Sequence, residues 1–425
     1  MRILLIGAAT SKGLSGLNLG NTIHGGGWVE NLVNHLALIK QLNVYISFFT
    51  PKLKAIKTTE IDGVTYIGLP ANDKRLNKIT ALMKRSLAEM VKKINPDITH
   101  IIGTERLYNY ELFKLVDRNK TVISVTGLVS VYAQHYFGQI DKSNFFFPSI
   151  GDLLRKGGPV KEQRLFRKFG YTEVKLLSEA KYVMGRTTWD YACTKKINPA
   201  IKYFYCGEIL NPIFFKDQWS FEKCKQHSIF VSQGSYPLKG LHRLFEAFPD
   251  VLQQYPDACI YIAGPNLWKV ASIKDKIKRT TYAKYLLKLI KRLNIPRNKI
   301  VFTGPLSPEQ MMAQYLQSNV FVMPSIIENS PNSLGEAMAV GVPCVASYVG
   351  GIPDMITHGE DGFLYAADEP YMLAYYIKKL FKNKELTINI GESARMSAFQ
   401  RFNKNKVIDT TLNIYNHILN QANEI

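Results

Sequence analysis

The fold is decided by residues 319–343, which read NVFVMPSIIENSPNSLGEAMAVGVP. Residues 319–323 are mostly β-branched, aromatic or long and apolar, which predicts a short buried strand. The spacing of apolar side chains then predicts a helix over residues 331–340, because Ser330 is a favourable N-cap and Pro331 suits the first helical position. A strand followed closely by a helix is typical of a parallel α/β sheet.

The same stretch predicts an anion-binding site at the start of the helix. The backbone amides of Asn332, Ser333 and Leu334 have no carbonyl one helical turn earlier and lie at the positive end of the helix dipole. Glu328 lies in the preceding loop and Glu336 just inside the helix, so both carboxylates can face one ligand. The alternative is a capped helix with two solvated acidic residues.

Strand and helix patterns alternate through most of the 425 residues, which predicts the α/β class with two doubly wound, Rossmann-like domains. The expected strands are residues 3–6, 44–49, 99–102, 122–125, 182–184, 229–231, 259–262, 300–302, 320–323 and 344–346. The pattern restarts near residue 211, so we expect domains over 1–210 and 211–396. Residues 397–425 predict a helical segment that packs back toward the first domain. Two such domains leave a cleft at the carboxyl ends of both sheets, where ligands bind.

The composition points to an anionic partner. The chain carries a formal net charge of +20, and nucleic acid, an anionic membrane surface and phosphorylated substrates all fit such a charge. A basic cluster over residues 142–168 includes the aromatic run 145–147, and basic charge beside aromatic side chains suits a membrane interface. The alternative is a solvated basic face whose apolar residues pack on the core. Because no nucleic-acid-binding module is recognised, no nucleic-acid partner is expected.

The cysteines and the N-terminus indicate the compartment. The five cysteines are scattered without metal-ligand spacing, which predicts reduced thiols and no bound metal. The apolar run over residues 1–7 predicts a first strand rather than a signal peptide, and no apolar stretch approaches the ~20 residues that cross a membrane. We therefore expect a cytoplasmic protein that visits the inner face of the membrane.

Two glycine-containing turns add candidate binding residues. Gly26 and Gly27 precede a predicted helix, where small residues allow a phosphate or sugar to approach the backbone. Gly234 and Ser235 follow the first strand of the second domain, shortly before Lys239, a cation suited to neutralise a diphosphate. The alternative for the first turn is a simple packing role, and the alternative for Lys239 is an ordinary surface lysine.

Taken in order, these features resemble the family-4 retaining glycosyltransferases of the GT-B fold over nearly the whole chain. The motifs that carry the resemblance are the glycine turn at 25–27, the turn Lys239-Gly240, the pair Glu328 and Glu336 at Glu-x7-Glu spacing, and the segments 337–346, 350–356 and 358–364. The resemblance implies transfer of a hexosyl group from a nucleoside-diphosphate sugar to a glycan or lipid-linked glycan, with retention of anomeric configuration. Local variants over residues 185–190 resemble a bacterial surface-polysaccharide subgroup.

The resemblance also implies roles for individual residues. Glu336 would hold the donor ribose and Glu328 would contact the donor sugar. Lys239 and the amides of Ser333 and Leu334 would stabilise the departing diphosphate, because fixed cations and dipoles aimed at developing charge lower the barrier. The resemblance therefore implies no metal and no cofactor besides the donor. It places the acceptor mainly in the first domain, with domain closure assembling the site.

The chain departs from the family pattern in three places. Family members often carry an arginine shortly before the lysine that corresponds to Lys239, and the stretch 233–235 here has none. Arg186 can supply the missing positive charge, or it can pair with Asp190. Thr126 stands where the family often has a histidine, with His135 further on. The third departure is the proline at position 331, which removes one amide near the phosphate.

Three other functions stay open at this point. A sugar-nucleotide-binding protein without catalysis is compatible with the missing histidine and arginine. A different GT-B enzyme, such as a phosphorylase or an inverting transferase, differs in the stereochemistry of its product. A nucleic-acid binder is suggested by charge alone.

Overall fold

A computed structural model describes residues 1–20, 27–155, 157–267 and 277–424, which form two compact units. Unit 1 comprises Met1–Val131, Arg167–Asn211 and Phe402–Ile425, and unit 2 comprises Tyr132–Phe166 and Pro212–Arg401. Each unit is built on one sheet, so the α/β prediction is confirmed. The expected division near residue 210 lies at the change of unit after Asn211.

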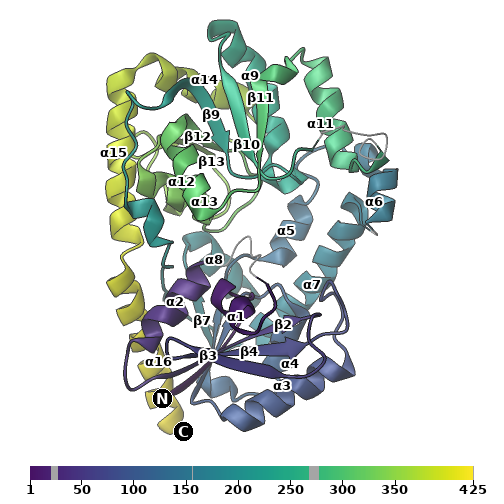
Figure 1. The fold of residues 1–425 in the computed structure, drawn as a ribbon, viewed down its shortest axis with the longest axis vertical. Helices are drawn as coiled ribbons and strands as arrows, with labels where there is room; N and C mark the ends of the chain where they lie inside the picture. The colour runs from purple at the N-terminus through teal and green to yellow at the C-terminus, as the bar shows by residue number, and fades with distance from the viewer. Residues whose placement is uncertain (21–26, 156, 268–276, 425) are drawn as a thin grey trace. The chain divides into compact units, whose positions relative to one another are not determined.

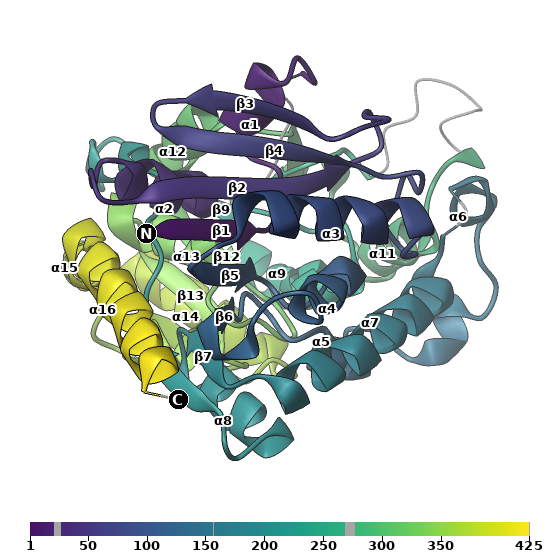
Figure 2. The same ribbon diagram turned by 90° about the horizontal axis from the view of Figure 1, so that it is seen from below.

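The described residues of unit 1 form an eight-stranded sheet in the order β3-β4-β2-β1-β5-β6-β7-β8 (Figure 2). Its strands are β1 Arg2–Ile6, β2 Asn43–Thr50, β3 Lys57–Ile61, β4 Val64–Pro70, β5 Ile98–Ile102, β6 Thr121–Ser124, β7 Tyr182–Gly185 and β8 Lys202–Tyr205. The pair β3–β4 is antiparallel, and the other neighbours are parallel. The five strands expected in the first half are confirmed as β1, β2, β5, β6 and β7.

The β3–β4 hairpin and β8 were not predicted. Asp62 and Gly63 connect β3 to β4 with φ angles of 50° and 75°, and an Asp-Gly pair between β-rich runs is a hairpin signal. That signal was present in the sequence. In contrast, β8 lies at the sheet edge, with an exposed residue at each end and two half-buried residues between them, and it carries little periodic information.

The helices of unit 1 cover both faces of its sheet. Its helices, including two that continue into unit 2, are α1 Ser11–Gly16, α2 Gly27–Ala37, α3 Ala81–Ile94, α4 Leu107–Phe113, α5 Val129–His135, α7 Pro159–Glu179, α8 Thr188–Ile197 and α16 Lys404–Asn423. Alternation along β1 sends Ile3 and Leu5 into a core shared with α2 and α16. Leu4 and Ile6 enter the opposite core with α3 and α4. Complete burial of each such side chain contributes about 1.5–3 kcal/mol.

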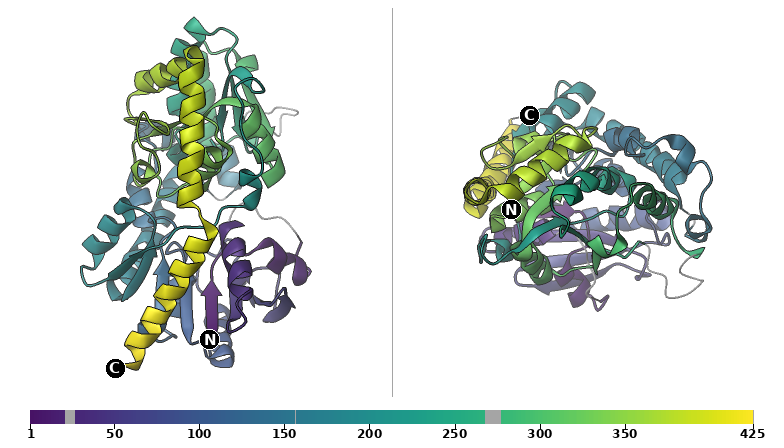
Figure 3. Two further views of the ribbon diagram at one scale, coloured as in Figure 1. Left: turned by 90° about the vertical axis from the view of Figure 1, so that its left-hand side faces the viewer. Right: turned by 90° about the horizontal axis from the view of Figure 1, so that it is seen from above.

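The C-terminal segment divides differently from the expected boundary at residue 397. Helix α15, Lys384–Arg401, continues through that position, and α16 starts after the N-cap Asn403, whose side chain accepts from Asn405 and Lys406 amides. In unit 1, α16 lies near the N-terminus (Figures 2 and 3). Val407, Ile414 and Ile418 enter the core with Ile3 and Leu5, so the helix completes that hydrophobic layer.

The described residues of unit 2 form a six-stranded, fully parallel sheet in the order β11-β10-β9-β12-β13-β14 (Figure 1). Its strands are β9 Lys225–Val231, β10 Cys259–Ala263, β11 Ile300–Gly304, β12 Ser318–Met323, β13 Cys344–Ser347 and β14 Phe363–Tyr365. Its remaining helices are α6 Ile150–Leu154, α9 Leu241–Gln254, α11 Thr281–Arg292, α12 Pro308–Gln317, α13 Asn332–Val340, α14 Pro370–Lys382 and α15. The five strands expected in the second half are confirmed, and β14 is an addition of three buried residues.

Residues 132–166 group with unit 2, although we expected them in the first domain. The physical reason is a buried polar cluster. Asp152 accepts from the Thr281 backbone amide at 2.9 Å and from the Ser149 amide at 3.3 Å. Gly151 packs so closely that a Cβ would lie 2.3 Å from the Lys278 carbonyl oxygen. Residues distant in sequence therefore form one packed segment.

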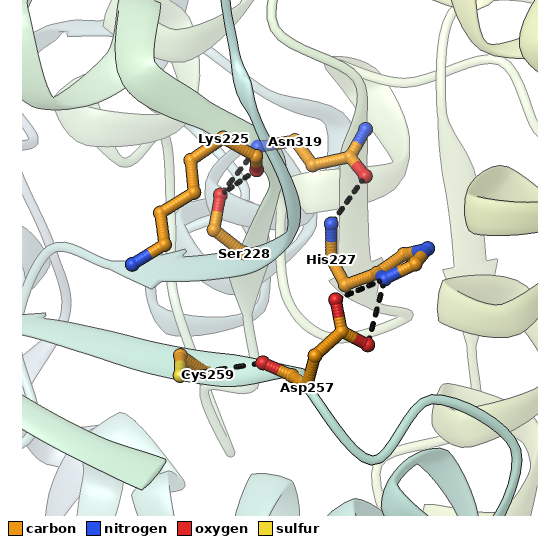
Figure 4. Close-up of polar contacts among 6 residues, drawn as sticks. All are labelled: Lys225, His227, Ser228, Asp257, Cys259 and Asn319. Atoms are coloured by element: carbon orange, nitrogen blue, oxygen red, sulfur yellow. Dashed lines mark hydrogen bonds and ion pairs between the residues drawn. The ribbon is translucent and has the colours of Figure 1, made fainter. Parts of the chain in front are cut away.

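The amino ends of β9, β10 and β12 are closed by polar contacts (Figure 4). The Asn319 side-chain oxygen accepts from the His227 amide at 3.0 Å, and the Asn319 amide donates to Ser228 Oγ at 3.0 Å. The His227 ring lies 2.8 Å from Asp257. These contacts stabilise the sheet edge opposite the carboxyl ends of the strands.

Candidate active site

The candidate site lies at the carboxyl edge of the unit 2 sheet. Three loops contribute to it, over residues 232–240 after β9, 324–331 after β12 and 348–351 after β13. These strands are parallel and are neighbours in the order β9-β12-β13, so their carboxyl ends bring the three loops together.

Gly240 allows the first loop to pack against the second. It adopts φ 65°, and a Cβ there would lie 1.6 Å from the Pro324 carbonyl oxygen. The Ile326 amide donates to the Leu238 carbonyl at 2.8 Å, which joins the two loops directly. No other residue type fits this position without displacing the backbone, because only glycine tolerates both the left-handed conformation and the close approach.

Lys239 and Glu328 form an ion pair between these two loops. Lys239 Nζ lies 2.5 Å from Glu328 Oε1, with only 21% and 11% of the two side chains exposed. Ser325 Oγ donates to the same carboxylate at 3.0 Å, and the ammonium lies 5.8 Å from the Tyr236 ring centroid. Burial by itself lowers the pKa of Lys239, but the Glu328 carboxylate and Tyr236 outweigh burial and raise that pKa. Lys239 is therefore a fixed cation.

The third loop supports the backbone of Glu328. The Gly351 amide donates to the Glu328 carbonyl at 3.0 Å. Gly350 adopts φ 52°, and a Cβ would lie 1.8 Å from the same carbonyl oxygen. Gly350 and Gly351 thus fix the backbone of the loop that carries Glu328, a role that the sequence pattern alone did not reveal.

The helix after β12 starts one residue later than predicted. Pro331 is the N-cap, without a side-chain capping hydrogen bond, and α13 begins at Asn332. Ser330 is not the cap, because its hydroxyl is buried and donates toward Met355 Sδ at 3.8 Å. The Leu334 amide donates to the Pro331 carbonyl at 3.0 Å, so the expectation that it points unpaired at a ligand is wrong. Ser333 lies at the second helical position, where a helix leaves its amides without intrahelical partners.

Glu336 is oriented by a tyrosine that sequence reasoning missed. The Tyr315 hydroxyl, from α12, donates to Glu336 Oε2 at 3.2 Å and to the Ser333 carbonyl at 3.0 Å. Tyr315 is fully buried, and burial together with the Glu336 carboxylate raises its pKa well above the usual value. The hydroxyl therefore stays protonated and keeps the carboxylate in place.

The glycine-turn residues have different environments. Gly26 lies outside the described residues. Gly27 is the exposed first residue of α2, and a Cβ there would meet open space. Gly234 is buried, and a Cβ would lie 2.6 Å from Leu241 Cδ2, so a larger residue here would displace the Leu241 side chain. Its neighbour Ser235 is half-buried.

The two substitutes considered for the family histidine lie in different settings. Thr126 Oγ1 donates to Glu105 Oε2 at 3.2 Å. His135 is the exposed last residue of α5.

Arg186 takes part in a buried cluster of unit 1. Its guanidinium lies 2.9 Å from the Glu208 carboxylate and 4.4 Å from the Trp28 ring centroid, with only 7% of its side chain exposed. Its backbone amide donates to the Asp190 carboxylate at 3.0 Å. The guanidinium therefore already balances a buried carboxylate, which sequence reasoning did not identify.

Two features of the described residues bear on metals and membranes. No group of three His, Cys, Asp or Glu side chains converges there as a metal site would. Within the same residues, no helix has both the length and the apolar character needed to span a bilayer.

Two Rossmann-like units with these sheet orders define the GT-B fold, and solved structures share it. Sucrose-phosphate synthase from Thermosynechococcus elongatus superposes with a TM-score of 0.73 at 17% identity, covering 99% of both chains. HepE of Anabaena, solved in complex with UDP-glucose, gives a TM-score of 0.65 at 16% identity over 100% of both chains. These likenesses establish the fold.

Residues 214–397, which include Lys239, Glu328 and Glu336, match the family described as "Glycosyl transferases group 1". The resemblance drawn from the motifs is thereby confirmed. N-acetyl-alpha-D-glucosaminyl L-malate synthase of Bacillus anthracis is 35% identical over 135 residues, which are 32% of this chain and 34% of that protein. The chain spans about a third to a half of the length of the curated relatives it matches.

Proposed function

We propose that the protein is a retaining glycosyltransferase that moves a hexosyl group from a nucleoside-diphosphate sugar to a glycan or lipid-linked glycan. The observation that carries the proposal is the buried pair Lys239–Glu328 at the carboxyl edge of unit 2. This pair lies within residues 214–397, which match the group 1 family. A fixed cation beside a carboxylate, next to a helix start, suits a diphosphate attached to a sugar.

The residues divide the work in the following way. During transfer, the bond between the anomeric carbon and the diphosphate oxygen breaks, and a bond to an acceptor hydroxyl oxygen forms on the same face. The proton of that hydroxyl passes to the departing diphosphate. Negative charge grows on the departing diphosphate, where Lys239 and the Ser333 amide stabilise it. Glu328 holds hydroxyl groups of the donor sugar, and Glu336, oriented by Tyr315, holds the donor ribose.

We further propose that transfer proceeds without a metal ion. The charge that a metal would otherwise neutralise is met by the Lys239 ammonium, which the raised pKa keeps protonated, and by the α13 dipole. Turnover that is unchanged in excess chelator is the expected result. A requirement for added Mg²⁺ or Mn²⁺ would contradict this part of the proposal.

Product stereochemistry tests the reaction itself. The full chain is incubated with UDP-glucose, the ligand of HepE, or with another sugar nucleotide that stabilises it. The anomeric proton of the new glycoside or of released sugar is then followed by NMR. We expect the first product to keep the donor's anomeric configuration, with no turnover for Glu328→Ala. Inverted product, or nucleotide binding without any turnover in the presence of a glycan acceptor panel, would contradict the proposal.

A basic and apolar patch supports contact with an anionic membrane and hence a lipid-linked acceptor in surface-polysaccharide synthesis. The exposed apolar members of this patch are Phe146, Phe147, Ile150, Leu153 and Leu154. Phe147 is 88% exposed, and Arg155 adjoins the patch. Phe145, which we expected in the exposed aromatic run, is instead 1% exposed and stacks on Phe137 at 5.4 Å.

Hydrogen bonds fix the position of the patch on unit 2. Ser149 caps α6 in a capping box with Asp152, and Arg155 donates to the Lys278 carbonyl at 2.7 Å. An apolar surface fixed beside basic side chains binds anionic lipid through both hydrophobic and electrostatic attraction. It would bring a protein of the cytoplasm to the inner membrane face without spanning it.

Liposome flotation tests the membrane part. The double variant Phe146→Ser/Phe147→Ser should float at least about fivefold less with phosphatidylglycerol vesicles, because two exposed aromatic anchors are lost. Tyr171→Ser, which removes an exposed aromatic side chain from unit 1, is the matched control. Equal flotation of the double variant and the control at low salt would contradict membrane contact through this patch.

A further inference from the structure

Unit 2 contains a concave site beside the proposed donor site. A cavity of about 460 Å³ opens at the carboxyl ends of β13 and β14. Gln139, Tyr348, His358, Tyr365 and Asp368 contribute its aromatic and polar lining, together with small apolar residues. We propose that this cavity is a saccharide subsite that holds a sugar residue of the acceptor. The inference rests on the proposed glycosyl transfer and adds an acceptor contact in unit 2.

The lining has the chemistry that sugars require. The Tyr348 side chain is 63% exposed and offers an aromatic face to the C–H groups of a sugar ring. Gln139 and Asp368 add an amide and a carboxylate, which bind sugar hydroxyls. Pockets that combine aromatic walls with a few polar groups are typical small-molecule sites, and this cavity has room for a sugar ring.

The walls of the cavity are fixed by hydrogen bonds and ring packing. The Tyr348 amide donates to the Tyr365 carbonyl at 2.7 Å. His358 Nδ1 accepts from the Leu364 amide at 3.0 Å, and its ring packs edge-on against Phe363 at 5.7 Å. A preformed wall binds a ligand without the entropic cost of ordering it.

Both sides of the cavity are tied to the segments that carry the Lys239–Glu328 pair. Tyr348 opens the loop 348–351, in which the Gly351 amide donates to the Glu328 carbonyl at 3.0 Å. On the other side, Arg243 donates to Gln139 Oε1 at 2.8 Å.

The turn before Gln139 packs on the Lys239 turn. A Cβ on Gly138 would lie 2.6 Å from the Pro237 carbonyl oxygen, and the Gly138 carbonyl lies 2.8 Å from His242 Nε2. A ligand in the cavity is therefore next to the backbone that positions both charged residues.

The position along the sheet favours an acceptor over the donor. The charged pair comes from loops after β9 and β12, the central strands, whereas the cavity lies after β13 and β14, toward one edge. A glycan that reaches the donor sugar near Glu328 and continues along this edge enters the cavity. The base and ribose of the donor are assigned to the Glu336 side of the site and do not need it.

Saturation-transfer NMR on the full chain tests the proposal. The probes are the methyl α- and β-glycosides of glucose, galactose, mannose and N-acetylglucosamine, each titrated in the presence of saturating UDP. We expect at least one glycoside to bind wild type, and to bind about 2- to 10-fold more weakly to Tyr348→Ala, the range for losing one aromatic contact. Asp368→Asn should also weaken binding, and Tyr171→Ala, which removes an exposed tyrosine of unit 1, should not.

A parallel thermal shift with UDP separates this proposal from the proposed function. UDP stabilisation with no glycoside bound, or with equal glycoside affinity in Tyr348→Ala and wild type, would overturn the subsite and leave the donor site standing. If UDP-glucose displaces the glycoside but UDP does not, the cavity holds the donor sugar, and this result would also overturn the acceptor subsite. If no nucleoside diphosphate stabilises wild type, the proposed function fails and the subsite falls with it.

Discussion

The buried pair Lys239–Glu328 gives the most exacting prediction, because it contributes both to the stability of unit 2 and to donor binding. Lys239→Met keeps the length and the apolar stem of the side chain but removes the charge. Glu328, of which only 11% is exposed, is then left without its cation. We expect unit 2 to be destabilised even in the absence of any nucleotide.

The magnitude follows from burial. Removing one partner of a fully buried ion pair costs about 3–5 kcal/mol, and the 21% and 11% side-chain exposure here reduces the expected loss to about 2–3 kcal/mol. In a unit of this size, that loss lowers the melting temperature by about 4–12 °C. Because folding raises the pKa of Lys239, this stabilisation is complete at neutral pH. It is lost only as the pH rises above the ordinary lysine value of about 10.4.

Differential scanning calorimetry at pH 7.5 on the two single variants and the double variant Lys239→Met/Glu328→Gln measures the pair. The double variant should be more stable than the sum of the single losses predicts, by about 1–2 kcal/mol. Lys384→Met breaks an exposed pair with Glu222 at 2.9 Å, with 58% and 61% exposure, and should melt close to wild type because exposed ion pairs contribute little to stability. Equal melting of Lys239→Met and Lys384→Met would refute the reasoning.

Three further predictions test other parts of the structure. Burial lowers the pKa of His242 to about 3, so its neutral form stabilises unit 2 above pH 6.5 and stability is lost as the pH falls. Between pH 6.5 and 5, wild type should lose about 1.5–2 kcal/mol of unfolding free energy that His242→Gln does not lose, as measured by urea unfolding. Parallel pH profiles of the two proteins would contradict this. Gly240→Ala should cost at least about 3 kcal/mol, because its Cβ would meet Pro324. Gly359→Ala, at φ 83° with open space around it, should cost only about 1 kcal/mol; equal costs would disprove the steric argument. Burial raises the pKa of Glu173, so Glu173→Gln removes an unfavourable buried charge. However, Oε1 and Oε2 each accept from a backbone amide at the start of α5, and the glutamine side-chain N–H group would face one of them. We therefore expect unit 1 to lose about 2 kcal/mol in thermal unfolding, and an unchanged melting temperature would refute this.

The sheets were predictable because buried parallel strands are encoded locally. Runs such as residues 3–6 and 320–323 are continuous apolar segments bounded by turns. This pattern can be recognised without knowing which elements pack against the strands. The edge strands β8 and β14 were not predictable, because β8 is half exposed and β14 has only three residues. The hairpin at Asp62 is the exception, since its turn signal was present and overlooked.

The candidate site was predictable in its members but not in its contacts. The sequence pattern and the family resemblance named Lys239 and Glu328, yet the two lie 89 residues apart, and only the tertiary fold brings them within 2.5 Å. The support from Gly350 and Tyr315 depends on packing between loops and helices, which leaves no local pattern. The one-residue error at Ser330 arose because burial against Met355 overrode its capping preference.

The central claim is that unit 2 binds a nucleoside-diphosphate sugar through the residues around α13. The most direct measurement is a thermal-shift panel of UDP, GDP, ADP and their sugar conjugates on wild type and Glu336→Ala. A ligand that binds only the folded state at about 100 times its dissociation constant adds about 2.7 kcal/mol. The account predicts a clear shift with one nucleotide that is lost in Glu336→Ala. No shift with any nucleotide, or an equal shift in the variant, would contradict it.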